Sequence, residues 1–136
     1  MNIQLQVGVK IFLKNKEGKY LLLKRSPEKY QSIKGNWDIV GGRIEPGSNL
    51  MDNLRREVME ETSLAINSSP ILIYAQDIIP NPEKHVVRLT YIGETDGEPV
   101  LDTSENIEYK WLTIDEVKDH EDLDIYVAEI IKNNLL

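Results

Sequence analysis

One short segment constrains this chain more than any other, because it places three glutamates beside the apolar stripe of a helix. Residues 48–62 follow a Pro-Gly turn, have helical spacing and offer Asn49 as the N-cap. At about 3.6 residues per turn, Glu57, Glu60 and Glu61 fall within roughly 100° of one another, next to the apolar side chains. The acids therefore lie at the edge of the buried face and not on the fully solvated side.

Like charges at this spacing repel one another, and the repulsion grows near an apolar surface, where the dielectric constant is low. Two outcomes relieve it: some of the carboxylates take up protons, or a cation binds among them. Hard divalent cations, Mg²⁺ above all, prefer carboxylate oxygens. An ordinary charged helix face with Arg55 and Arg56 as counter-charges explains the helix alone equally well.

The rest of the chain alternates apolar runs with turn residues, so it predicts several strands and few helices. Strands are expected at 5–13, 20–25, 37–40, 70–79, 86–94 and 107–112. After the last strand, Thr113 as N-cap and Glu116 at N3 predict a C-terminal helical region. Because strands and helices do not alternate strictly, we expect an α/β (α+β) sandwich around a mixed β-sheet, formed by a single domain over residues 1–136.

Charge is unevenly distributed along the chain and sums to −7. Residues 1–60 hold 11 Lys/Arg against 7 Asp/Glu, whereas residues 61–136 hold 5 against 16. An acidic chain argues against binding a nucleic-acid polymer, because such binding depends on neutralising phosphates. It does not exclude a small anionic ligand bound through a cation or a local basic patch.

The sequence has no recognisable targeting signal. Its N-terminus alternates apolar and polar residues instead of placing a basic start before an apolar block, and no apolar run approaches the length of a membrane span. Cysteine is absent, which excludes disulfides and cysteine-ligated zinc. We therefore expect a cytoplasmic protein that does not contact membranes.

A glycine pair, Gly41 and Gly42, stands just before the Pro-Gly turn and the acidic helix. A tight turn is the simpler explanation of the pair alone, but a free glycine carbonyl there could also complete an oxygen cage around a cation. The joint spacing of the glycines, the arginine and the acids favours the cation.

The stretch from Gly42 to Leu64 resembles the Nudix box, G-x5-E-x7-R-E-U-x-E-E-x-G-U, in which U is apolar. The residues that fit the pattern are Gly42, Arg56, Glu57, Val58, Glu60, Glu61 and Leu64. Two positions depart from it, since Ser48 stands where the family has Glu and Ser63 where it has Gly. The lead-in "KGNWDIVGG" and the order of strands also resemble this family, so the resemblance extends beyond the box.

The resemblance implies an α/β/α sandwich and a hydrolase that cuts the pyrophosphate bond of a nucleoside diphosphate linked to another group. Mg²⁺ or Mn²⁺ is the implied cofactor. Its implied ligands are Glu57, Glu60 and Glu61, with the Gly41 carbonyl and a later acid, Glu105, or Glu108 as the second choice. Plain surface acidity is the alternative explanation of Glu105 and Glu108. Together with Arg56, the four acids Glu57, Glu60, Glu61 and Glu105 are the expected catalytic set.

The chemistry follows from charge, because an anionic pyrophosphate repels nucleophiles. Metal ions neutralise it, orient it and acidify a water molecule for in-line attack. A carboxylate can take the proton of that water, with Glu57 and Glu105 as candidates. His85 is a weaker candidate for this role.

Several residues before the box offer contacts to the substrate. Lys24 and Arg25 end the second expected strand, where their charge could meet phosphates. Trp37 could stack on a base or belong to the core. Lys34, Tyr30 and Gly42 complete the set of expected substrate-side residues.

The two departures have different consequences. Ser48 cannot form the ion pair with Arg56 that the family's Glu implies, although Glu45 could substitute for it. Ser63 should cost about 1 kcal/mol if its backbone is left-handed. Neither change removes an expected ligand, so we expect activity.

The leading hypothesis is a pyrophosphohydrolase acting on a small-molecule nucleotide. The small size resembles members that act on nucleoside triphosphates, whereas Pro80 resembles a proline of members that cleave ADP-ribose. A nucleotide-binding or regulatory module without strong catalysis is the alternative, and a purely structural acidic domain is a third. A monomer and a homodimer are both compatible with the sequence.

Overall fold

The computed structural model describes residues 2–28 and 35–136, and these ranges form seven strands and three helices. The strands are β1 (Gln4–Lys14), β2 (Tyr20–Arg25), β3 (Trp37–Asp38), β4 (Val40–Arg43), β5 (Ile71–Asn81), β6 (Lys84–Glu94) and β7 (Asn106–Leu112). The helices are α1 (Leu50–Thr62), α2 (Ile114–Lys118) and α3 (Ile125–Lys132). Within the described ranges no helix is long and apolar enough to cross a membrane.

All seven strands belong to one mixed sheet with the order β3-β2-β1-β6-β5. β1 pairs in parallel with β6 and antiparallel with β2 and β4, while β7 pairs antiparallel with β2. In the described part of the chain β1 and β2 pair at one position, Lys14 with Tyr20. Beyond it β1 continues alongside β4, and β2 alongside β3 and β7, so the sheet opens between its central strands.

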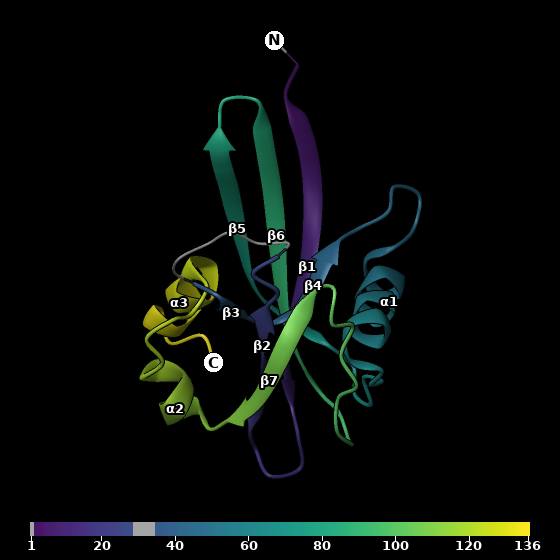
Figure 1. Cartoon of the computed structure of the whole chain (residues 1–136). Coiled ribbons are helices and arrows are strands. Elements are labelled where there is room, and N and C mark those ends of the chain that lie inside the picture. The colour runs from purple at the N-terminus through teal and green to yellow at the C-terminus, as the bar shows by residue number, and fades with distance from the viewer. Residues whose placement is uncertain (1, 29–34) are drawn as a thin grey trace.

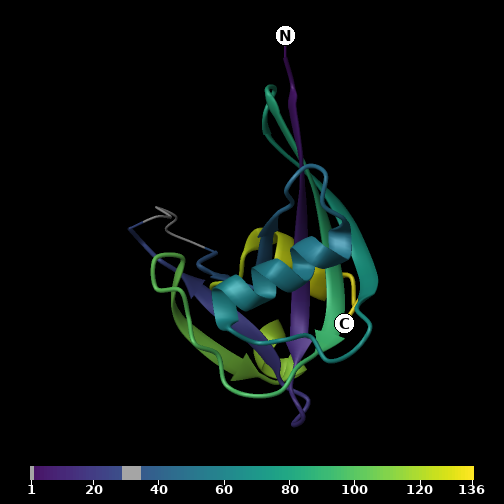
Figure 2. The same cartoon turned by 90° about the vertical axis from the view of Figure 1, so that its right-hand side faces the viewer.

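Helices cover both faces of this sheet, with α1 on one face and α2 and α3 on the other (Figure 1, Figure 2). Because side chains alternate along a strand, β1 supplies both cores. Ile11 packs in a cluster with Leu54 of α1, and Phe12 packs in another with Ile130 of α3. The mixed sheet with few helices that the sequence predicts is confirmed, and its layers are those of an α/β/α sandwich.

The strand predicted at 37–40 is instead two short strands separated by Ile39. The chain crosses the opening of the sheet here, because β3 pairs with β2 and β4 pairs with β1. Gly41 and Gly42 therefore lie inside β4 and not in a free turn. A Cβ on Gly41 would lie 2.0 Å from the carbonyl oxygen of Val9, so only glycine fits this close approach.

The hairpin of β5 and β6 is tighter than the sequence predicts. β5 ends at Asn81 and β6 begins at Lys84, so the connection is shorter than the gap between the strands expected at 70–79 and 86–94. Pro80 lies inside β5, where the pairing shifts register between Ile78 and Asn81. A proline cannot donate to a strand ladder, and this irregularity accommodates it.

The caps of the helices follow the sequence closely. The Asn49 side chain accepts a 2.8 Å hydrogen bond from the Asp52 N–H and begins α1. Thr113 and Glu116 form the predicted capping box of α2. Ser63 ends α1 in the left-handed conformation, with φ 60° and ψ 15°.

Candidate active site

A pocket of about 580 Å³ is lined by residues from both sides of the opening in the sheet. One part of its lining is acidic and comes from α1 and from the start of β7, with Glu57, Glu60, Glu61 and Glu105. Another part carries both charges and comes from the strands and from the start of α3, with Lys10, Arg25, Asp38, Arg88 and Asp124. Charged side chains from α1 and from the segment just before α3 thus line the same pocket.

Glu61 is the most enclosed of the α1 acids. Its Oε2 accepts a 2.7 Å hydrogen bond from the Gly41 N–H, and its Oε1 accepts one from the Asn106 side chain at 3.2 Å. Burial raises the pKa of Glu61 to about 7, although these donors and Lys10 oppose the shift. Gly41 therefore contacts the acids through its N–H, whereas the sequence suggested its carbonyl.

Glu57 lies against the second glycine of the pair. A Cβ on Gly42 would lie 2.6 Å from Glu57 Oε2, so the missing side chain makes room for this carboxylate. Burial raises the pKa of Glu57, and the Arg56 guanidinium, which donates to its Oε1 at 2.9 Å, works in the other direction. A side chain at position 41 would thus clash with the backbone of β1, and one at position 42 would clash with the Glu57 carboxylate.

Arg56 organises the acids from outside the pocket lining. It donates to Glu57 and, at 3.3 Å, to Glu60, and its Nε lies 3.8 Å from Glu45. It also donates at 2.9 Å to Asn53, a fully buried residue of α1. The contact with Glu45 is the one that the sequence suggested in place of the missing Glu at position 48.

Asn53 fastens the loop before α1 to the helix. Its amide nitrogen donates to the carbonyls of Ser48 and Asn49, at 3.1 and 2.7 Å, while its amide oxygen accepts from the Glu45 N–H at 2.8 Å and from Arg56. Every donor of this side chain is used. Asn53 therefore connects the loop to the arginine that holds two of the acids.

The chemistry of these donors fits a hard divalent cation, because carboxylate oxygens gather in a pocket where Gly42 leaves room for one of them. Their arrangement is not a closed cage: among residues 2–28 and 35–136, no three acidic or histidine side chains form a group that could hold a metal ion. Two features reduce the repulsion among the acids. Arg56 donates hydrogen bonds to Glu57 and Glu60, and the raised pKa values of Glu57 and Glu61 favour their neutral forms. Both are ways in which repelling carboxylates are stabilised.

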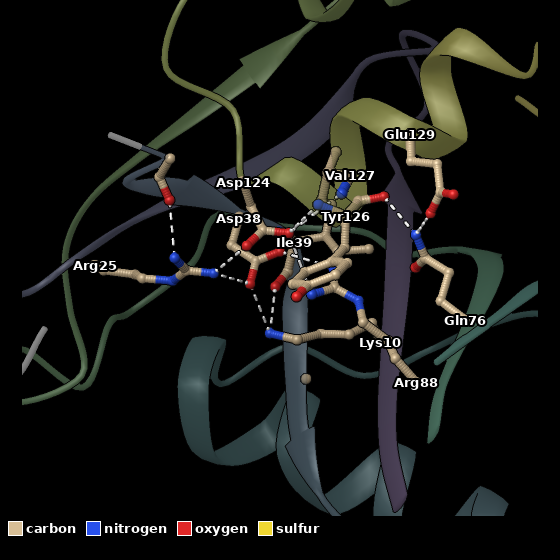
Figure 3. Close-up of polar contacts among 12 residues, drawn as sticks. Lys10, Arg25, Asp38, Ile39, Gln76, Arg88, Asp124, Tyr126, Val127 and Glu129 are labelled. Atoms are coloured by element: carbon tan, nitrogen blue, oxygen red, sulfur yellow. Dashed lines mark hydrogen bonds and ion pairs between the residues drawn. The ribbon is translucent and has the colours of Figure 1, made fainter. Parts of the chain in front are cut away.

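Next to the acids, four charged side chains form a closed set of ion pairs that we call the Asp–Arg ring: Arg25, Asp38, Arg88 and Asp124 (Figure 3). Arg25 Nη2 donates to Asp38 and to Asp124, at 2.7 Å each. Arg88 donates to the same two carboxylates, at 3.0 and 3.3 Å. Each arginine thus joins both aspartates.

The ring is almost entirely buried, with Asp38, Asp124 and Arg88 no more than 5% exposed. Burial alone would raise the pKa of Asp38, but the facing charges of Arg88, Lys10 and Arg25 hold it well below its usual range. Asp124 also caps α3 by accepting hydrogen bonds from the N–H groups of Tyr126 and Val127. The ring therefore links the strands to the start of α3.

Most of the residues expected at the site line the pocket: Gly41, Gly42, Glu57, Glu60, Glu61, Glu105 and Arg25. Of the two places suggested for Trp37, the structure has the core, where this residue is 6% exposed and faces His120 and Lys110. Lys24, Glu108 and His85 also do not line the pocket, and His85 contacts Asp77 on the β5–β6 hairpin. Tyr30 and Lys34 lie outside the described residues.

Sequence reasoning missed Lys10, Asp38, Arg88 and Asp124. Three of them interrupt apolar runs that read as strands, "VGVKIFL", "WDIV" and "VVRLTY". A charged residue is rarely buried without a partner or a function. A charged residue within an apolar strand could therefore have indicated these three site residues. The sequence alone does not show which of them contact one another.

Known proteins share this sequence pattern and this fold. The family model of the NUDIX domain matches residues 4–133. A curated protein of Bacillus subtilis (strain 168), described provisionally as an 8-oxo-dGTP diphosphatase, is 29% identical over 107 residues. Those residues are 78% of this chain, which spans 65% of the length of that relative.

Two crystal structures have the same architecture. A MutT protein from Methanosarcina mazei Go1 matches with a TM-score of 0.81 and 26% identity, covering 98% of this chain and 94% of that one. A MutT NUDIX hydrolase from Burkholderia pseudomallei matches with a TM-score of 0.79 and 21% identity, covering 98% and 99%. Since the family model spans nearly the whole sequence and the acids of the box line one pocket, the chain belongs to the NUDIX family.

Proposed function

We propose that this chain is a divalent-cation-dependent hydrolase that cleaves the pyrophosphate bond of a nucleoside diphosphate linked to another group. The pocket is the observation that carries this proposal, because it joins Glu57, Glu60 and Glu61 to the cations Lys10 and Arg25. Carboxylates suit a hard cation, and positive side chains suit phosphates. A volume of about 580 Å³ is typical of small-molecule sites.

Mg²⁺ or Mn²⁺ would be held by Glu57, Glu60 and Glu61, with Gly41 and Glu105 beside them. When bound, such an ion neutralises the pyrophosphate and acidifies a water molecule. The chain itself orients its acids through Arg56 and removes the proton of the attacking water with a carboxylate. Glu57 and Glu105 are the candidates for that base, and both line the pocket.

A (deoxy)nucleoside triphosphate is our preferred substrate over an ADP-ribose-like nucleotide. The hint of ADP-ribose came from Pro80, and this residue is exposed in β5 and does not line the pocket. The name of the Bacillus subtilis relative, which refers to 8-oxo-dGTP, supports the same preference. The substrate is in either case a small molecule and not a nucleic-acid polymer.

Release of monophosphate from a panel of nucleoside triphosphates and diphosphate-linked nucleotides, with MgCl₂, tests the function. We expect Glu57→Gln to lower the rate by orders of magnitude, because it removes a charged oxygen ligand. Glu108→Gln is the matched control, since this glutamate is exposed on β7 and does not line the pocket. The absence of turnover for every compound would rule the hydrolase out.

The second candidate is a nucleotide-binding or regulatory module with weak or no catalysis. It is motivated by Ser63, whose left-handed backbone strains the end of the box helix, and by Ser48, which stands where the family has Glu. This candidate predicts nucleotide affinity without hydrolysis, unchanged by Glu57→Gln. A melting temperature that neither Mg²⁺ nor Mn²⁺ changes would instead favour a structural domain, because an ion that binds the native state must stabilise it.

The remaining sequence predictions stay predictions. They are a single domain over residues 1–136, a cytoplasmic location without membrane contact, and a monomer or a homodimer.

A further inference from the structure

Lys10 lies in the middle of β1, yet its side chain is only 17% exposed and lines the pocket. Its ammonium donates to Asp38 Oδ2 at 3.0 Å and to the Ile39 carbonyl at 3.2 Å (Figure 3). An ammonium has three N–H donors, so these two contacts leave one. A lysine held at a pocket in this way has a donor to offer to a ligand.

The Asp–Arg ring is balanced without Lys10. It contains two guanidinium groups and two carboxylates, and each arginine already contacts both aspartates. Lys10 adds a third cation to Asp38 and contacts its Oδ2, which Arg25 also contacts at 2.7 Å. The five side chains together therefore carry one surplus positive charge.

The α1 acids are within electrostatic reach of this surplus charge. Burial raises the pKa of Glu57 and of Glu61, and in both cases Lys10 acts in the opposite direction. Lys10 also lies opposite Gly41 in the pairing of β1 with β4, and Gly41 contacts Glu61. Lys10 thus stands between the acids and the Asp–Arg ring.

We propose that Lys10 binds a phosphate oxygen of the nucleotide, beside the acids that would hold the divalent cation. This inference rests on the proposed function, because it assumes a ligand with a pyrophosphate group. A cation among the acids compensates their charge, and the charge of Lys10 is then available to an anionic ligand. Charge-assisted hydrogen bonds of this kind are the strong ones in phosphate sites.

Isothermal titration calorimetry with inorganic pyrophosphate and MgCl₂ tests the role of Lys10. Lys10→Met keeps a side chain of similar length without the charge, and we expect its Kd for pyrophosphate to rise about tenfold to hundredfold. The Kd for free nucleosides should change by less than about twofold, since they carry no phosphate. Lys14→Met is the matched control, because Lys14 belongs to the same strand but lines a different hollow.

Three results would overturn the inference. They are an unchanged pyrophosphate Kd in Lys10→Met, an equal loss of nucleoside affinity, and no pyrophosphate binding by the unaltered protein. The first two would show that Lys10 merely supports Asp38.

A second variant separates charge from folding. The chain has no cysteine, so Lys10→Cys introduces a single thiol. Its thiolate displaces bromide from 2-bromoethylamine, which rebuilds an ammonium at the length of lysine. Recovery of pyrophosphate affinity after alkylation supports the inference, and equal affinity before and after contradicts it. If instead Lys10 binds pyrophosphate but no nucleotide is hydrolysed, the proposed function fails while the inference stands.

Discussion

The backbone N–H of Gly41 donates a 2.7 Å hydrogen bond to Glu61 Oε2 and so ties β4 to the last turn of α1. The bond favours the ionised carboxylate, but burial outweighs it and raises the pKa of Glu61 from 4.5 to about 7. A buried carboxylate is costly to keep ionised. Its ionisation therefore links the acidic end of the pocket to the stability of the fold.

We predict that stability without divalent cations falls between pH 4.5 and pH 7 because of Glu61. Its folded-state pKa is raised, so its protonated form stabilises the fold below pH 4.5 and this contribution is lost as the pH passes about 7. The effect is on the order of 3 kcal/mol at most. Urea unfolding in EDTA measures it, and Glu61→Gln should show a flatter pH profile. Parallel profiles for the two proteins would contradict the prediction.

Ser63→Gly should stabilise the protein. Ser63 ends α1 at φ 60°, where a side chain costs about 1 kcal/mol and glycine costs little. Thermal unfolding should show a melting temperature higher by roughly 3–5 °C. Ser63→Ala is the control, because it keeps the strain and removes only the 3.4 Å contact of the hydroxyl with the Val100 carbonyl. A glycine variant that melts below the unaltered protein would show that this contact outweighs the strain.

Asn53→Ala should destabilise the protein by about 2–3 kcal/mol, because it removes four hydrogen bonds of a fully buried side chain. The groups that lose a bond are the Glu45 N–H, the carbonyls of Ser48 and Asn49, and one donor of Arg56, although the Asn49 carbonyl keeps the bond from the Asn53 backbone N–H. Urea unfolding measures this loss. Asn49→Ala is the comparison, since an N-cap costs only about 1 kcal/mol. Equal losses for the two variants would mean that the loop does not depend on Asn53.

Asp38→Asn should cost about 3–5 kcal/mol, because it leaves Arg88 buried with too little negative charge. Removing Arg88 as well, in Asp38→Asn/Arg88→Met, should recover part of this loss, since a missing pair is cheaper than a broken one. Urea unfolding of the two single variants and the double variant gives the coupling between these residues. Strictly additive losses would show that the Asp–Arg ring does not act as a unit.

The sequence predicted what depends on neighbours along the chain. Helix α1, its N-cap Asn49 and the capping box of Thr113 with Glu116 all follow from residues within one turn of each other. Gly41, Gly42 and the acids of α1 were expected together from their spacing in the sequence, and they line one pocket.

The rest of the site depends on contacts between distant segments. Asp38 and Arg88 are 50 positions apart, and they meet only because β2 and β1 separate and α3 closes over the strands. The choice between the two places suggested for Trp37 also depends on such contacts, since the pairing of β3 with β2 turns its side chain into the core. The hydropathy of a single segment predicts neither the contact between Asp38 and Arg88 nor the orientation of Trp37.

The ion pair between Arg25 and Asp124 joins positions 99 apart in the chain. Closing so long a loop costs more chain entropy than joining α1 to the nearby β4. Asp124 is the N-cap of α3, so detachment of this helix would take Asp124 from the ring, whereas Asp38 would keep its contacts with Arg25 and Arg88. Local unfolding of one short helix is thus expected to open one corner of the pocket while Lys10 on β1 and the acids of α1 keep their places.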